Sequence, residues 1–380
     1  MLTALTAGAL FVMAAQASAA TKWKVQPTPN PGGGTGYPYD ALYGVSATST
    51  SNAWAVGVFK KDGYFRTLIE RYDGTAWQHQ VSINVGPYDN ILRGVRATSK
   101  TNAWAVGWYR DSGDIDRTLI EHYDGSAWTR QASPNPHGGR DALNDVAAAS
   151  PSNAWAVGAQ YIGDPSHRWR SLVEHYNGTS WAVQSSISFQ AYDNELIAVS
   201  ALSPTNAWAV GYFGTQSSGP FFTLVEHYDG SSWNFVNSPD PGGSQVLYDV
   251  SAVSASDIWA VGSFRKNFVD HTLIEHYDGF NWTHVPSPNP QGQPAALFAV
   301  KAISASDVWA VGEWGQGIGK NLIEHYDGTK WTVQASPNVG QYTNALIGVG
   351  GTSSSNLFAV GESAVDNMNL HWYTLAMHCC

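Results

Sequence analysis

The sequence is poor in cysteine, in charge and in long apolar runs. Its only cysteines, Cys379 and Cys380, are the last two of 380 residues. A disulfide framework inside the protein is therefore excluded, and we expect both cysteines to lie outside the core and to carry little structural weight.

Charged residues make up only 13% of the chain, and the formal net charge is −10. Because lysine and arginine never form a run, binding to nucleic acid through phosphate neutralisation is disfavoured. The 3.6-residue periodicity of amphipathic helices is also missing, which argues against a helical repeat protein.

The one long apolar segment lies at the N-terminus. It ends in a small-residue pattern at residues 17–20, as in a cleavable signal peptide, although no Lys or Arg precedes Lys22. The segment is too short and too interrupted to predict a transmembrane helix. We predict a signal peptide at residues 1–20, one domain at residues 21–380 and an extracellular monomer; a poorly ordered N-terminal tail is the alternative.

A repeat of about 50 residues fills the rest of the chain. Each copy carries a Trp-Ala-Val-Gly segment, then Glu-His-Tyr-Asp-Gly, then a lone Trp. The residues at the first tryptophan position are Trp54, Trp104, Trp155, Trp208, Trp259, Trp309 and, in the seventh copy, Phe358. The lone tryptophans are Trp77, Trp128, Trp181, Trp233, Trp282, Trp331 and, out of phase at the N-terminus, Trp23.

Each copy predicts four short strands. Apolar residues alternate with period two, and Asp-Gly pairs mark hairpins. The peptide that begins at Trp331 is almost identical to the one that begins at Trp23. The seventh copy, which breaks off at the C-terminus, therefore takes its last strand from the N-terminus. We predict an all-β, seven-bladed β-propeller with four-stranded blades, whose last blade is closed by the N-terminal strand.

The Asn-Ala-Trp-Ala-Val-Gly and Tyr-Asp-Gly-x-x-Trp motifs resemble those of secreted bacterial seven-bladed propellers and of Ycf48-like and sialidase-repeat propellers. This likeness covers residues 21–380 and implies the propeller fold. Its Ycf48-like part implies an assembly factor as one function. The Ser-x-Asp-x-Gly-x-x-Trp box of true sialidases is not cleanly present, so glycosidase activity does not carry over.

Most of the conspicuous residues belong to the repeat. Thirteen of the seventeen tryptophans occupy its two tryptophan positions. The Glu-His pair, as at Glu121 and His122, occurs in five copies, whereas a catalytic site needs one constellation. We interpret the tryptophans as core residues and the glutamates as buried, hydrogen-bonded groups.

Aromatic residues outside the repeat gather in the connections between the second and third strands. Together with the connections between blades, these loops form one variable face. The aromatics there are Trp108, Trp169, Trp314, Trp372, Tyr161, Tyr212, Phe213, Phe221, Phe222, Phe264 and Phe268. We expect ligand binding by Trp108, Trp169, Trp314, Trp372, Tyr161, Tyr212, Phe222 and Phe264, because exposed rings stack on sugars or anchor protein partners. The alternative is that they fold back into small loop cores.

Two positions before each first-strand leucine stands a residue that is polar in six of the seven copies. The set is Asp40, Asn90, Asp141, Asn194, Gln245, Ala295 and Asn344, and we expect it to circle the mouth of the central channel, with Asp145 and Asp249 deeper. Such oxygens suit Ca²⁺ at Asp40, Asn90, Asp141, Asn194 and Asn344. Capping of the strand starts is the alternative, and no other cofactor is expected.

Two classes of function follow. The first is a secreted, non-enzymatic module that binds a glycan or a protein on the variable face. The second is a hydrolase or lyase acting on a glycan or small molecule, with Glu313 and Glu362 as acids and His271 and His371 as bases. No Ser or Cys nucleophile motif and no His-x-x-x-His spacing occurs. A copper–radical oxidase of the galactose-oxidase type is excluded, because its cross-linked cysteine has no counterpart in the body of the chain.

Overall fold

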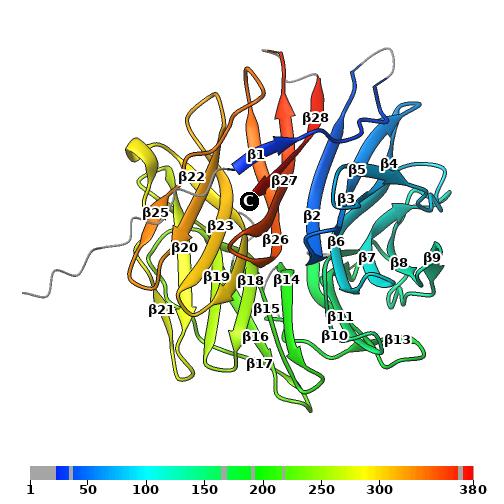
Figure 1. Ribbon diagram of the computed structural model, residues 1–380. Helices are drawn as coiled ribbons and strands as arrows, with labels where there is room; N and C mark the ends of the chain where they lie inside the picture. The colour runs from blue at the N-terminus through cyan, green and yellow to red at the C-terminus, as the bar shows by residue number, and fades with distance from the viewer. Residues whose placement is uncertain are drawn as a thin grey trace, which may run out of the picture.

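Seven antiparallel sheets of four strands each form the blades of a ring (Figure 1). The computed structural model describes residues 23–33, 37–163, 169–189, 193–215, 219–366 and 371–379. The predicted signal peptide and Cys380 lie outside the described residues. The arrangement confirms the predicted seven-bladed β-propeller.

The strands of each blade follow one another from the centre of the ring outward. Blades 1 to 3 contain β2 (Asp40–Ser49), β3 (Asn52–Lys61), β4 (Tyr64–Tyr72) and β5 (Trp77–Gln80); β6 (Asn90–Ser99), β7 (Asn102–Arg110), β8 (Asp116–Tyr123) and β9 (Trp128–Gln131); and β10 (Asp141–Ser150), β11 (Asn153–Tyr161), β12 (Trp169–Tyr176) and β13 (Trp181–Gln184). Blades 4 to 6 contain β14 (Asn194–Ser203), β15 (Asn206–Gly214), β16 (Phe221–Tyr228) and β17 (Trp233–Phe235); β18 (Gln245–Ser254), β19 (Asp257–Lys266), β20 (Val269–Tyr277) and β21 (Trp282–His284); and β22 (Ala295–Ser304), β23 (Asp307–Trp314), β24 (Lys320–Tyr326) and β25 (Trp331–Val333). Blade 7 contains β26 (Asn344–Ser353), β27 (Asn356–Ala364), β28 (Trp372–Cys379) and, outermost, β1 (Trp23–Gln26).

A short 3-10 turn, η1 (Pro290–Gly292), lies in the loop before blade 6. Among the residues that the structure describes, no helix is long and apolar enough to cross a membrane.

The glycine of the Trp-Ala-Val-Gly segment is required by a close approach of two strands. The inner strand bulges after its leucine, so that the register between β6 and β7 shifts between Leu92 and Gly94. A Cβ atom on Gly107 of β7 would lie only 2.0 Å from the carbonyl oxygen of Ile91. No other residue type fits this position without moving the backbone.

Aromatic side chains join each blade to the next. The Trp54 ring of blade 1 lies 4.7 Å from Tyr123 and 5.1 Å from Trp128 of blade 2, measured between ring centroids. The indole of Trp54 is completely buried. The same contact recurs round the ring through Trp104, Trp155, Trp208, Trp259 and Phe358. The repeated tryptophans are therefore core residues, as predicted.

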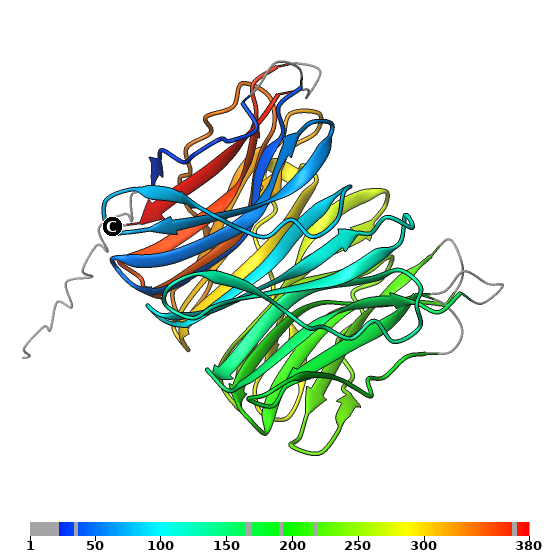
Figure 2. The ribbon, with the colours of Figure 1, turned by 90° about the vertical axis from the view of Figure 1, so that its right-hand side faces the viewer.

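The N-terminal strand completes this series. Strand β1 pairs with β28, and both views show it in dark blue beside the red strand (Figures 1 and 2). Its Trp23 packs edge-on against Trp309 of blade 6, at a centroid distance of 5.8 Å. The loop after β1 adds a second attachment, because the backbone N–H of Thr374 donates to Asn30 Oδ1 at 2.9 Å. The predicted closure thus combines strand pairing, core packing and a loop contact.

The Glu-His pair belongs to the scaffold. The His122 ring stacks on Trp104 at 4.1 Å, and in blade 1 the guanidinium of Arg71 takes its place over Trp54 at 4.8 Å. The carboxyl of Glu121 is buried and accepts the backbone N–H of Ile83, from the loop between blades 1 and 2. Burial raises the pKa of this carboxyl to about 8. Glu174, Glu226 and Glu324 likewise accept hydrogen bonds from the loops that lead into their blades, whereas the buried carboxyl of Glu70 has no hydrogen-bond partner among the described residues.

The expectation for the terminal cysteines was wrong for Cys379. This residue is fully buried in the core cluster that includes Trp23 and Met377. It occupies the place of the repeat tyrosine, since it pairs with Trp23 as Tyr123 pairs with Trp128. The closing strand brings Trp23 over the end of β28, and this contact buries a residue that the linear sequence leaves at a terminus.

Replacing Trp23 by alanine tests the closure. We expect the free energy of unfolding in urea to fall by about 3–5 kcal/mol, because a buried indole is lost and a cavity remains against Trp309. Val25→Ala, at a half-exposed position on the same strand, should change it by less than about 0.5 kcal/mol. Equal, small effects of both substitutions would show that β1 does not stabilise the ring.

The buried glutamates predict that stability declines as the pH rises. Glu121 has a pKa of about 8 in the folded state against 4.5 as its ordinary value, so between these values the folded chain binds the extra proton. The stabilisation is complete below pH 4.5 and is lost as the pH rises through 8. Glu121→Gln should make the slope of unfolding free energy shallower by up to about 1.4 kcal/mol per pH unit.

Asp124→Asn provides the control for this measurement in the same blade. Hydrogen bonds from Ser126 and Ala127 lower the pKa of the exposed Asp124 carboxyl to about 2, so it is ionised throughout the range. Its replacement should leave the slope unchanged between pH 5 and 9. An unchanged slope for Glu121→Gln as well would contradict a buried neutral acid.

Candidate functional site

The two faces of the ring differ in the variety of their loops. One face holds the connections from first to second and from third to fourth strands, and its hairpins repeat one geometry. In blade 1, Asp73 Oδ1 accepts the backbone N–H groups of Thr75 and Ala76, and Gly74 has φ +103°. The other face, here called the loop face, holds the remaining connections, which differ in length and composition. Neighbouring blades pack with their sheets face to face beneath these loops (Figure 2).

The eight aromatic residues predicted to bind ligand are half-buried rather than exposed. All lie in or next to the connections between second and third strands, as expected. Four of them pack as follows: Trp108 beneath the Arg110 guanidinium (5.7 Å), Trp314 beneath the Lys320 ammonium (4.9 Å), Trp169 on Tyr161 (5.6 Å) and Trp372 near Tyr39 (5.9 Å). The others contact their own blades: Tyr212 donates its hydroxyl to Glu195 (2.8 Å), Phe222 stacks on Phe213 (5.5 Å) and Phe264 stacks on His271 (5.3 Å). The structure thus groups them into small clusters under the loops, and their role in binding stays a prediction.

Other apolar side chains are exposed at the tips of these loops. Among the described residues, twelve large apolar side chains are exposed, and seven of them lie on the loop face. We call these seven the loop-tip residues: Tyr37, Tyr64, Val81, Phe268, Ile318, Val339 and Val365. Six of them come from blades 1, 5, 6 and 7 and the connections between these blades, and Val81 directly follows β5 in the connection from blade 1 to blade 2. Of the seven, only Phe268 had been named from the sequence. For Tyr37, Tyr64 and Ile318 a lone apolar residue beside Gly, Pro or Asp was the only signal.

Phe268 is the most unusual loop-tip residue. It is 97% exposed, at the tip of the β19–β20 hairpin. Asn267 and Phe268 have φ values of +52° and +64°, whereas the matching hairpin of blade 1 uses Asp62 and Gly63 at +54° and +85°. A left-handed conformation costs a bulky residue about 1–2 kcal/mol that glycine avoids. The chain therefore holds an apolar ring in water at a strained position.

The polar residues before the first strands cap loops instead of circling the channel mouth. Asn90 is completely buried: its Oδ1 accepts the backbone N–H groups of Val85 and Gly86, and its Nδ2 donates to the carbonyl of Tyr88. Asn194 and Asn344 cap their loops in the same way. The expected position at the mouth was wrong, because Asn90, Asn194 and Asn344 instead satisfy the backbone of their own loops. Asp141 is buried as well, but its carboxyl oxygens have no hydrogen-bond partner among the described residues.

Asp40 and Asp141 occupy the same position as carboxylic acids. Asp40 Oδ1 accepts the backbone N–H of Gly32 at 2.9 Å. Both residues are fully buried, and burial raises the pKa of each carboxyl to about 6. Within the described part of the chain, no group of three or more His, Cys, Asp or Glu residues is arranged to hold a metal ion.

The acids proposed for catalysis do lie near each other. Glu313 and Glu362 follow the repeat glycine in neighbouring blades, and the charge of Glu313 adds to burial in raising the pKa of Glu362 to about 7. The Tyr39 hydroxyl donates to Glu362 Oε2 at 2.8 Å. The proposed bases are engaged elsewhere, since His271 stacks on Phe264 and His371 is hydrogen-bonded to Asp366.

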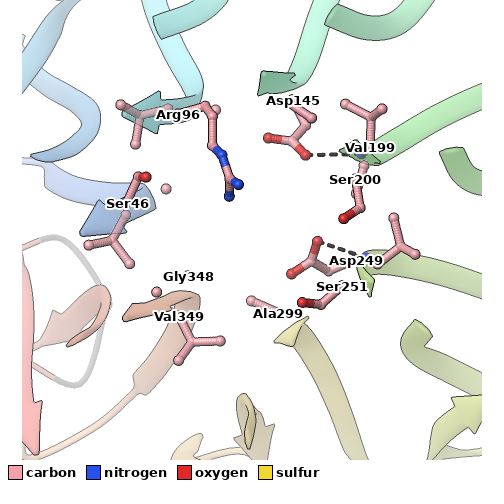
Figure 3. Close-up of a pocket in the computed structure, with 18 of the residues that line it drawn as sticks. Ser46, Arg96, Asp145, Val199, Ser200, Asp249, Ser251, Ala299, Gly348 and Val349 are labelled. Carbon is pink, nitrogen blue, oxygen red and sulfur yellow. Dashed lines mark hydrogen bonds between the residues drawn. The ribbon is translucent and has the colours of Figure 1, made fainter. Parts of the chain in front are cut away.

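The inner strands of all seven blades enclose a central cavity of about 630 Å³ (Figure 3). As expected, Asp145 and Asp249 line it. Two cationic side chains, Arg96 and Lys301, line it too, and these were missed. They stand at a repeat position where the other blades have Ser46, Ala147, Ser200, Ser251 and Gly350.

The sequence matches no protein-family model and no curated protein. Solved structures share the fold. YCF48 bound to a D1 peptide is 14% identical, with a TM-score of 0.55, over 96% of this chain and 97% of that one. YCF48 from Cyanidioschyzon merolae is also 14% identical, with a TM-score of 0.55, over 95% and 98%. The six-bladed fungal lectin of Aleuria aurantia is 14% identical, with a TM-score of 0.50, over 77% and 95%. At this identity the likeness shows the propeller fold alone.

The comparison of the amide at Asn90 with the carboxylic acid at the equivalent position Asp141 predicts that Asp141→Asn stabilises the protein. At neutral pH the buried Asp141 carboxyl is ionised at the expense of folding, and it cannot donate to loop carbonyls as Asn90 does. We expect a gain of about 1–2 kcal/mol in unfolding free energy at pH 8, shrinking towards pH 5. The reverse change, Asn90→Asp, should destabilise the protein; a loss of stability in Asp141→Asn would contradict this interpretation.

Proposed function

We propose that the protein is a secreted, non-enzymatic binding module that holds a protein partner on the loop face. The observation that carries this proposal is the concentration of exposed apolar side chains at the loop tips of blades 1, 5, 6 and 7. Exposed apolar groups rimmed by polar loops are typical of protein-binding surfaces.

Phe268 supports the proposal most directly. A strained, fully exposed aromatic residue lowers the stability of the free protein, and such costs are found where function requires them. Burial of a Phe ring in a pocket of a partner is the kind of contact that dominates binding energy.

The structural neighbours agree with a binding role in general. One YCF48 structure contains a bound D1 peptide, and the fungal lectin recognises fucose. A lectin would present a similar shallow site on successive blades. The loop-tip residues differ from blade to blade, which favours one extended protein surface over repeated sugar sites.

A hydrolase or lyase is the second candidate, favoured by the proximity of Glu313 and Glu362. Both carboxyls have raised pKa values and are therefore capable of giving up a proton near neutral pH. Glu362 is, however, committed to the Tyr39 hydroxyl. We therefore place binding first.

Phe268→Gly separates binding from folding. Residues 21–380 would be used to select binders from a phage library of random peptides and would also be applied to a glycan array. We expect selected peptides to bind at least about 30-fold more weakly to Phe268→Gly, because a central aromatic anchor contributes about 2 kcal/mol or more. The melting temperature should stay equal or rise, since glycine relieves the strain.

Phe280→Ser is the matched control, because Phe280 is equally exposed but lies in a hairpin of the opposite face. It should leave peptide binding unchanged. If glycans bind on the array and no peptide is selected from the phage library, the ligand is a sugar and not a protein. Turnover of a glycoside that Glu313→Gln abolishes would favour the enzyme instead.

A further inference from the structure

The inner strands carry polar side chains that hold neighbouring blades together. Ser46 Oγ accepts the backbone N–H of Ala97 at 3.1 Å, and Asp145 Oδ2 accepts that of Val199 at 3.0 Å. Ser200, Asp249 and Ser251 accept backbone N–H groups of the following blades in the same manner. These groups satisfy donors on the free edges of the neighbouring inner strands, as the dashed line from Asp145 to Val199 illustrates in Figure 3.

Arg96 and Lys301 interrupt this series. Both are donors only, so neither can accept a backbone N–H as the serines do. The Arg96 guanidinium points into the middle of the ring (Figure 3). Within the described part of the chain, neither cation forms a hydrogen bond or an ion pair, although both are within reach of the charges of the channel. Arg93, on the same strand as Arg96, also lines the cavity, and both arginine side chains are exposed there.

The two aspartates of the channel are thus committed to the backbone and Glu195 to the side chains of Asn144 and Tyr212, whereas Arg96 and Lys301 have no such partner among the described residues. Unpaired donors deep in a channel retain their full capacity for a ligand. We propose that the central channel binds a small organic carboxylate between Arg96 and Lys301. This site is independent of the loop-tip residues and of the partner proposed for them.

The surroundings favour a singly charged carboxylate with an apolar body. The planar fork of Arg96 matches the two oxygens of a carboxylate. The nearby Asp145 and Asp249 disfavour a second negative charge, as on a phosphate. The Tyr248 and Phe298 rings, which also line the cavity, lie 5.6 Å apart and offer an apolar lining to the rest of the molecule, as does Tyr43 from blade 1.

Binding should weaken as the pH rises. The titratable groups that face the channel are Tyr43, Arg93, Arg96, Asp145, Glu195, Tyr248, Asp249 and Lys301. Burial raises the pKa of Asp145 to about 6 and that of Asp249 to about 8, and burial lowers that of Lys301 to about 8. Acidification therefore neutralises the repelling acids, whereas alkaline pH removes the charge of Lys301.

Calorimetric titration of residues 21–380 with benzoate and with phenylacetate tests the site, with benzamide and inorganic phosphate as comparisons. We expect saturable binding of at least one acid, tighter at pH 6 than at pH 9, and no saturable binding of benzamide. Arg96→Gln and Lys301→Gln should each weaken binding by about tenfold or more, because each removes a charge-assisted hydrogen bond.

Lys330→Gln is the matched control, since Lys330 lies in a hairpin of the opposite face. It should leave the affinity unchanged, and melting curves without ligand would show which variants fold. If Arg96→Gln does not fold, Lys301→Gln and Arg96→Lys decide the question. The proposal is overturned if neither acid binds saturably, if benzamide or phosphate binds as tightly as the acids, or if the channel variants match Lys330→Gln.

Discussion

The ring depends on one contact between blades, an aromatic side chain of a second strand buried against Tyr and Trp of the next blade. In the pair of Trp54 with Trp128, the rings meet edge to face with no solvent between them. Seven such contacts are needed to close a circle, and the last is made by Trp23 from the N-terminus. The conserved geometry of each blade follows, because every sheet must present the same two aromatic positions.

The packing of the blades also determines which backbone groups the polar side chains must satisfy. Inner strands have a free edge, which the serines and aspartates of the channel satisfy, and the loops above them are held by buried amides such as Asn90. Buried glutamates such as Glu121 accept hydrogen bonds from the loops that connect neighbouring blades. Among the described residues, the loop-tip residues on one face and Arg96 and Lys301 in the channel are groups that these contacts leave unused. Both proposed sites consist of such unused groups.

The fold could be predicted from the sequence because the same aromatic positions and turn motifs recur in seven copies. It predicted the wrong exposure for Trp108 and its counterparts because loop conformation, which has no period, decides whether a ring folds back. The burial of Cys379 and the capping role of Asn90 depend on contacts between segments far apart or on backbone donors, which residue spacing does not reveal. Arg96 could have been found, since it breaks a series of small residues, yet only the structure shows that it points into a cavity.

The pairing of β1 with β28 also governs when the ring can form. Trp23 is among the first residues of the domain to be synthesised, and its partner Cys379 is among the last. Blades 1 to 6 need only local contacts, but β1 has no partner strand until β28 has been synthesised. Contacts between such distant residues form slowly, and an open strand edge invites association with other chains. Ring closure is therefore the step at which correct folding and aggregation compete.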